Sequence, residues 1–141
     1  WTAGPESIIF VLSNMTSIAR STPKQARLRD VENLFEAFAD PTRIRILNLL
    51  VAGELCVCDI VALLKLPQPT VSRHLALLRS SSLVTVTREW KYAHYRLAAP
   101  AHAIHANLVA CLESCFIHIP SLSAERSRAA KRILQREVNP C

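Results

Sequence analysis

The spacing of apolar residues changes along this chain from that of helices to that of strands. Val71, Leu75 and Leu78 follow one another at intervals of three or four residues, the spacing of one helix face. Directly afterwards, Leu83–Thr87 and Tyr92–Leu97 alternate apolar with polar residues. Two alternating segments separated by a short polar stretch predict a β-hairpin. The pattern therefore predicts a mainly α fold with one small β-hairpin, preceded and followed by helices.

Capping and breaking residues set the expected helix boundaries. Asp40 has the side chain of an N-cap, and Pro41 suits the first helical position, where no backbone N–H is needed. Gly53 is expected to end that helix, and Pro120 to break the long apolar helix before it. The predicted helices cover residues 28–39, 41–52, 55–65, 69–80, 101–118 and 124–137.

The length of 141 residues suits a single core. We assign residues 1–27 to an N-terminal extension, residues 28–119 to the folded domain and residues 120–141 to a C-terminal helix and tail. The only methionine is Met15, which leaves open whether residues 1–14 belong to the native protein. No apolar stretch approaches the roughly 18 residues that a membrane-spanning helix needs, so we expect no membrane partner.

The charge distribution favours a polyanionic partner. The chain carries a net charge of +6, and residues 40–99 hold eight basic against four acidic side chains. Most of the excess therefore falls in the segment with the clearest local structure. Clustered basic charge of this kind is typical of nucleic-acid-binding domains.

The helices expected at residues 55–65 and 69–80 are joined by a tight turn, and the second is polar on one side. A helix-turn-helix places such a second helix in the major groove of duplex DNA, and a following hairpin forms a wing. An ordinary solvated helix face is the alternative interpretation. In the DNA-binding interpretation, the residues that contact base edges are Gln68, Thr70, Ser72, Arg73 and His74, and those that contact flanking phosphates are Arg88, Lys91 and Arg96.

Four segments, Ala37–Leu47, Glu54–Ile60, Gln68–Arg79 and Tyr95–Leu97, together resemble the ArsR/SmtB family of metal-responsive repressors. The resemblance covers about residues 28–100. It implies a winged-helix homodimer, paired through its first and late helices, that binds operator DNA and releases it when a metal or metalloid binds. Trp90 stands at the wing turn, where the family often has glycine, so the geometry of that turn is left open.

Five cysteines favour thiol chemistry over a disulfide scaffold, because the chain otherwise has the character of a cytoplasmic protein, whose thiols stay reduced. Cys56 and Cys58 fall in the first turn of the helix expected at residues 55–65, where the helix dipole favours thiolates and soft metal ions. Helical positions two apart point to nearly opposite sides, so one ion would take both sulfurs only if this turn unwinds. Metal binding would then shift the recognition helix. The alternative is that both cysteines are small core hydrophobes.

The segment Cys56-Val57-Cys58-Asp59 matches the arsenic-sensing motif of the family, which implies trivalent arsenic or antimony as inducer. The arsenite sensors of the family usually carry a third cysteine three positions later, where this chain has Val61. Arsenite offers three sites to thiols, whereas methylarsenite or an arylarsenical offers two. An organic inducer therefore stays an open alternative.

Two further cysteines, Cys111 and Cys115, are spaced to lie on one face of the late helix. They complete the first site, form a separate dithiol site, or line an apolar dimer face. Cys141 is a weaker candidate ligand at the terminus. The sequence leaves these alternatives open.

Three histidines on or near the late helix, His102, His105 and His118, are similar to the ligands of zinc-sensing relatives. Few carboxylates accompany them, so we expect structural roles. No enzymatic activity is expected, because two glycines provide no phosphate-binding loop and no Cys-x-x-Cys motif is present. The remaining alternatives are a zinc or cadmium sensor and a repressor that senses oxidation through disulfide formation.

Overall fold

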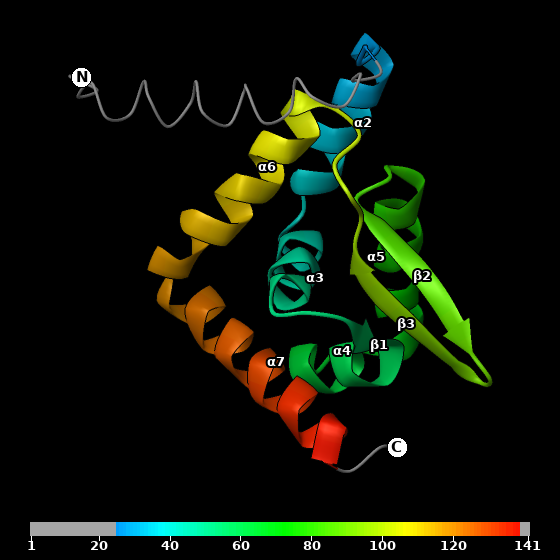
Figure 1. Cartoon of the computed structure of the whole chain (residues 1–141), viewed down its shortest axis with the longest axis vertical. Coiled ribbons are helices and arrows are strands. Elements are labelled where there is room, and N and C mark those ends of the chain that lie inside the picture. Colours follow the sequence, from blue (N-terminus) through cyan, green and yellow to red (C-terminus); the bar gives the residue numbers. More distant parts are fainter. Residues whose placement is uncertain (1–24, 139–141) are drawn as a thin grey trace.

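The computed structural model describes residues 25–138, whose arrangement is shown in Figure 1. The elements in chain order are α2 (Leu28–Phe38), α3 (Pro41–Val51), β1 (Leu55–Cys56), α4 (Val57–Leu64), α5 (Gln68–Ser80), β2 (Val84–Glu89), β3 (Tyr92–Leu97), α6 (Ala103–Ser114), the 3-10 helix η1 (Phe116–His118) and α7 (Pro120–Val138). Asp40 caps α3 as predicted, because its Oδ1 accepts a hydrogen bond from the Arg43 backbone N–H at 2.9 Å. The predicted mainly helical architecture with a central hairpin is confirmed.

The central sheet contains a third strand that the sequence pattern does not predict. Strand β1 pairs antiparallel with β3, with Leu55 opposite Tyr95 and Cys56 opposite His94, so the strand order is β1-β3-β2. The prediction that a helix begins near residue 55 is therefore wrong for these two residues. A strand of two residues is too short to show an alternating pattern, and both of its residues are buried.

Helix α3 lies at the centre of the domain. All residues from Ile46 to Leu50 are buried, which requires packing on several sides. Figure 1 shows α6 and α7 on one side of α3, and α5 with the β2–β3 wing on the other. The face of α5 predicted to be buried, formed by Val71, Leu75 and Leu78, belongs to the same core. The exposed face of α5 is thereby held on the side of the domain opposite α7.

The late helices differ from the sequence prediction in their boundaries. The helix expected to reach residue 118 ends at Ser114 and continues as η1, and α7 begins at Pro120 instead of residue 124. Proline fits the first position of a helix as well as the end of one, which explains the error. In the described part of the chain no single helix has the length and apolarity to cross a membrane. The two segments 103–118 and 120–138 reach that length and apolarity only when taken together, and they are bent relative to each other.

Polar contacts fix the first half of α7 to α3. Asn48 is buried, and its Nδ2 donates a hydrogen bond to the Leu122 carbonyl at 2.8 Å. The Arg126 guanidinium donates to Asn48 Oδ1 at 2.7 and 3.0 Å. Arg45 forms an ion pair with Glu125 at 2.6 Å. Because buried amides and carboxylates are stable only when their hydrogen bonds are made, these contacts fix the position of α7 along α3.

The wing turn has an unusual backbone conformation. Glu89 pairs with Tyr92, so the turn consists of Trp90 and Lys91. Trp90 has φ 56°, in the left-handed region that glycine adopts more easily than other residues. Lys91 Nζ lies 5.0 Å from the centroid of the Trp90 ring, within the range of a cation–π contact. The turn that the sequence left open is therefore formed with tryptophan in the conformation usual for glycine.

Candidate DNA interface and thiol sites

The first turns of α5 present an open polar face. Gln68, Ser72 and Arg73 are exposed, and Thr70 is half-buried. The turn before α5 begins with Lys65 in the left-handed conformation at the end of α4, which lets α5 start within a few residues. Helix α5 is thus presented as a helix-turn-helix requires, with Gln68, Ser72 and Arg73 open to solvent.

His74 differs from the other predicted reading residues because it is turned toward α3. Its Nδ1 lies 3.7 Å from Asp40 Oδ1. Burial raises the pKa of Asp40, but the hydrogen bond from the Arg43 N–H and the nearby His74 and Arg43 charges outweigh it, so the pKa lies below its usual value. Asp40 therefore stays ionised and attracts the imidazole. His74 links α5 to the start of α3.

The wing carries the predicted phosphate-contacting residues on its surface. Arg88 and Lys91 are exposed at the end of the hairpin, and Figure 1 shows this hairpin extending away from the domain beside α5. Arg96 is also exposed, with its Nε 3.3 Å from Thr85 Oγ1 on the neighbouring strand. The cations thus lie on the same side of the molecule as α5.

Cys56 lies immediately before the first turn of α4, in extended conformation, with only 2% of its surface exposed. Its Sγ–H donates to Asp59 Oδ2 at 3.3 Å, and Arg136 Nη2 donates to the same sulfur at 3.0 Å. The Asp59 side chain, 3% exposed, also forms ion pairs with Arg136 and with Arg132 Nε, the latter at 2.9 Å. Two cations from α7 thus neutralise one buried carboxylate beside the thiol.

Cys58 is exposed on α4, so the two thiols of the motif differ in environment. The prediction that the first helical turn must unwind to bring both sulfurs to one ion assumed that both residues are helical, and this is wrong for Cys56. For both sulfurs to bind one ion, the Cys56 side chain would have to leave its contacts with Asp59 and Arg136. Within residues 25–138 no three His, Cys, Asp or Glu side chains are grouped to hold one metal ion.

Cys111 on α6 and Cys115, the C-cap residue of that helix, form a second pair of thiols. Both are exposed. Partial burial raises the pKa of Cys111, and the adjacent Cys115 thiol raises it further. The Cys115 backbone N–H donates to the Cys111 carbonyl at 2.9 Å, so the two residues lie one helical turn apart, as their spacing predicts. Cys141 lies outside the described residues.

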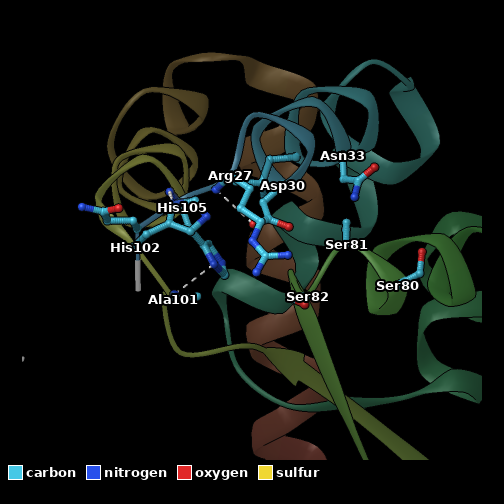
Figure 2. Close-up of a pocket in the computed structure, with 11 residues that line it drawn as sticks. Arg27, Asp30, Asn33, Ser80, Ser81, Ser82, Ala101, His102 and His105 are labelled. Atoms are coloured by element: carbon cyan, nitrogen blue, oxygen red, sulfur yellow. Dashed lines mark hydrogen bonds between the residues drawn. The ribbon is translucent and has the colours of Figure 1, made fainter. Parts of the chain in front are cut away.

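His102 and His105 make hydrogen bonds within the start of α6. His102 Nδ1 accepts from the His105 backbone N–H, and His105 Nδ1 accepts from the Ala101 N–H, both at 3.3 Å. Figure 2 shows them beside a surface cavity of about 570 Å³ between α2, α5 and α6, which contains no cysteine. Burial, together with His102, lowers the pKa of His105. The structural roles expected for these two residues agree with this geometry; His118 is exposed on η1.

Sequence patterns do not identify the two arginines of α7 as part of the thiol site. Arg132 and Arg136 lie on the last helix, 73 and 80 positions away from the residues that they contact. The available signals are an aspartate three residues after Cys56 and two arginines at helical spacing. Neither signal says which helix faces which.

Known proteins are similar to this chain in sequence and in fold. The model of the bacterial regulatory protein, arsR family, matches residues 40–86. The arsenical resistance operon repressor of Escherichia coli K12 is 47% identical over 77 residues, which span 54% of this chain and 66% of that repressor. A cadmium resistance transcriptional regulatory protein CadC homolog of Staphylococcus aureus is 38% identical over 91 residues, 64% of this chain and 75% of its own length.

Solved structures show the same architecture. The solution structure of the homodimeric winged helix-turn-helix DNA-binding domain of Mb0332 from Mycobacterium bovis has 30% sequence identity and a TM-score of 0.54. It covers 64% of this chain and 85% of that domain. HlyU from Vibrio cholerae has 27% identity and a TM-score of 0.57, over 68% of this chain and 98% of HlyU. Sequence and fold agree, and the chain belongs to the ArsR family of winged helix-turn-helix transcriptional repressors.

Proposed function

We propose that this repressor binds duplex operator DNA as a homodimer and releases it when a trivalent arsenical or antimonial binds Cys56 and Cys58. The observation that carries the proposal is the position of these two thiols, at the start of the helix that directly precedes α5. A ligand that moves the start of α4 acts on the element that positions the recognition helix.

The open face of α5 and the wing support the DNA-binding part of the proposal. Gln68, Thr70, Ser72 and Arg73 would contact base edges, where arginine suits guanine and glutamine suits adenine. The basic residues of the wing, Arg88 and Lys91, would contact the phosphates that flank them. His74 would contribute by holding α5 in place, because its imidazole faces Asp40.

Exposed apolar residues on the first helix support a dimer. Leu28 and Phe35 lie on one side of α2, seven residues apart, and are 76% and 56% exposed. Exposed apolar patches often mark a protein–protein contact. Pairing through α2 and α6 would cover them, and the relative Mb0332 is homodimeric. An operator with two half-sites about one helical turn apart would follow.

The donor set fits a soft, thiophilic inducer. Cys56 and Cys58 supply two sulfurs, and the carboxylate in contact with Cys56, Asp59, is already paired with two arginines. Hard cations prefer several free carboxylates. Two thiols would displace two hydroxyl groups from a trivalent arsenic acid, so that two As–S bonds form and two water molecules leave without any change of oxidation state.

Among residues 25–138 no third thiol is grouped with this pair, which bears on which arsenical is preferred. Val61 stands at the position of the family's third cysteine, and Cys111 and Cys115 lie on a different helix. We assign them to a separate dithiol site. A methylated or aryl arsenical, which forms two bonds to thiols, would then be as good an inducer as arsenite.

The proposal is tested with an operator selected from a random duplex library. Fluorescence anisotropy of the labelled operator would be titrated with arsenite, methylarsenite, phenylarsine oxide, antimonite, cadmium and zinc under strong reductant. Release by the arsenicals and antimonite at lower concentrations than by cadmium or zinc supports the proposal. Release by mild peroxide alone, reversed by reductant, would instead favour a redox sensor.

A further inference from the structure

The end of α7 is attached to the start of α4 by two arginines one helical turn apart. Arg132 Nε contacts Asp59 Oδ1 at 2.9 Å, and Arg136 contacts both Asp59 and the Cys56 sulfur. The first half of α7 is fixed to α3 by separate contacts at Asn48. Of the apolar residues in its last turns, Leu134 and Val138 face mostly solvent, and Ile133 packs, partly buried, against the core. The two arginines are therefore the main polar attachment of this end.

The Arg136 guanidinium lies on the sulfur atom that an inducer must reach. The thiol donates its proton to Asp59 and accepts a hydrogen bond from Arg136, so its polar contacts are both taken. An arsenic atom bonds through a sulfur lone pair and needs room for its own substituents. It therefore competes with Arg136 for the same side of the sulfur.

We propose that Arg136 is a positioning residue that covers Cys56 in the inducer-free repressor, and that inducer binding displaces it from the sulfur and loosens the last turns of α7. This inference rests on the proposed function. The Cys56 S–H bond breaks, an As–S bond forms, and the proton leaves with an arsenic hydroxyl group as water. The rotated sulfur no longer contacts Arg136, so one of the attachments between α4 and α7 is lost.

The same residue would select among inducers by charge. Trivalent arsenic acids and phenylarsine oxide are neutral near pH 7, whereas cadmium and zinc arrive as dications. A guanidinium in contact with the sulfur repels a dication in a poorly solvated site, whereas a neutral ligand meets no such charge repulsion. Arg136 would thus favour arsenicals over divalent metals, a property that a purely structural helix contact would not have.

The first test measures access to Cys56 without any arsenical. In the full chain with Cys58, Cys111, Cys115 and Cys141 changed to serine, the rate of alkylation of Cys56 by neutral N-ethylmaleimide is followed by mass spectrometry. Arg136→Ala should react about tenfold faster, the factor expected for loss of a charge-assisted hydrogen bond. The control, Arg128→Ala, removes an exposed arginine of the same helix and should leave the rate unchanged.

Equal alkylation rates in Arg136→Ala and Arg128→Ala would overturn the proposal. If circular dichroism shows that Arg136→Ala folds poorly, Arg136→Lys replaces it in the test. Lysine keeps the positive charge near Asp59, but it lacks the planar guanidinium that contacts Asp59 and the sulfur at the same time. We expect Arg136→Lys to be alkylated at a rate between those of the wild-type residue and Arg136→Ala. A rate no faster than with arginine at this position would overturn the proposal.

The second test uses phenylarsine oxide and cadmium with the otherwise unmodified repressor. Hydrogen exchange in residues 131–138 should become faster when phenylarsine oxide binds, and Arg136→Ala should shift the ratio of cadmium to phenylarsine oxide sensitivity toward cadmium. Unchanged exchange with the arsenical bound would overturn the displacement. Faster alkylation in Arg136→Ala combined with no operator release by phenylarsine oxide would support the covering of Cys56 by Arg136. It would contradict the proposed function, in which an arsenical is the inducer.

Discussion

The Arg132 guanidinium donates to the Asp59 carboxylate at 2.9 Å, although 73 residues separate them in the chain. This contact joins the last helix to the helix that precedes the recognition helix. The Asp59 side chain is nearly inaccessible to solvent, so its charge depends on partners from α7. The stability of the thiol site is therefore tied to the C-terminal helix.

Removal of both arginines should destabilise the fold more than the two single changes suggest. In Arg132→Ala or Arg136→Ala one cation still pairs with Asp59, and we expect each to cost about 1 kcal/mol. In the double variant the buried carboxylate has neither partner, and the cost should rise to about 3–5 kcal/mol. Urea unfolding at fixed protein concentration measures these values. Strict additivity would show that Asp59 does not depend on the pair.

Arg73 and His74 are neighbours on α5 but should behave differently when replaced. Arg73→Ala should weaken binding to the specific operator by about 1–3 kcal/mol and leave stability unchanged, because its side chain is exposed. His74→Ala should lower the free energy of unfolding and change base preference little, because its ring faces Asp40. Operator titrations at fixed salt and urea unfolding separate the two. The reverse result would mean that His74 reads the DNA.

His105 should make stability fall in mildly acidic solution. Burial and His102 lower its pKa in the folded state below the ordinary 6.5, so the unfolded chain binds more protons. The neutral ring contributes to the free energy of unfolding in full above pH 6.5. This contribution is lost as the pH falls from 6.5 to the lowered pKa of the folded state, by at most about 1.4 kcal/mol per pH unit.

The check on His105 compares wild type with His105→Phe by urea unfolding at several values from pH 7.5 to 5.5. Subtracting the two free energies of unfolding removes the contribution of the other histidines. Wild type should lose stability relative to the variant as the pH falls. A difference that is constant with pH would contradict the buried, neutral state of this ring.

The local parts of the fold follow from the sequence, and the long-range contacts do not. The cap at Asp40, the buried face of α5 and the hairpin are set by neighbours in the chain, and the patterns predict them. Strand β1 forms because β3 supplies hydrogen-bond partners for its backbone. A pattern of only two residues cannot predict that pairing. Likewise, whether Pro120 ends or begins a helix depends on how α7 packs against α3.

The candidate site shows the same division. The motif at Cys56 and Cys58 is visible in the sequence, but the burial of one thiol and the exposure of the other depend on β1 and α7. Arg136 lies on the Cys56 sulfur because α7 packs beside α4, and the two residues are 80 positions apart in the chain. No local pattern contains that information.

The number of thiols at the site should decide the response to different arsenicals. If Cys56 and Cys58 act alone, methylarsenite should release the operator at least as well as arsenite, since two As–S bonds satisfy it. The double variant Cys111→Ser/Cys115→Ser should then respond to both as wild type does. Loss of the arsenite response in this variant, with the methylarsenite response intact, would instead establish a shared site of three thiols.

Operator release by phenylarsine oxide in single cysteine variants decides whether the thiols at the start of α4 form the switch. Cys56→Ser and Cys58→Ser should each bind the operator with wild-type affinity, because neither residue lies on α5 or the wing, and each should fail to release it at concentrations that release wild type. The variant Cys111→Ser/Cys115→Ser, measured in parallel, should release the operator normally. Normal release by both Cys56→Ser and Cys58→Ser, with loss of release in the α6 variant, would place the sensor on α6 and contradict the proposal.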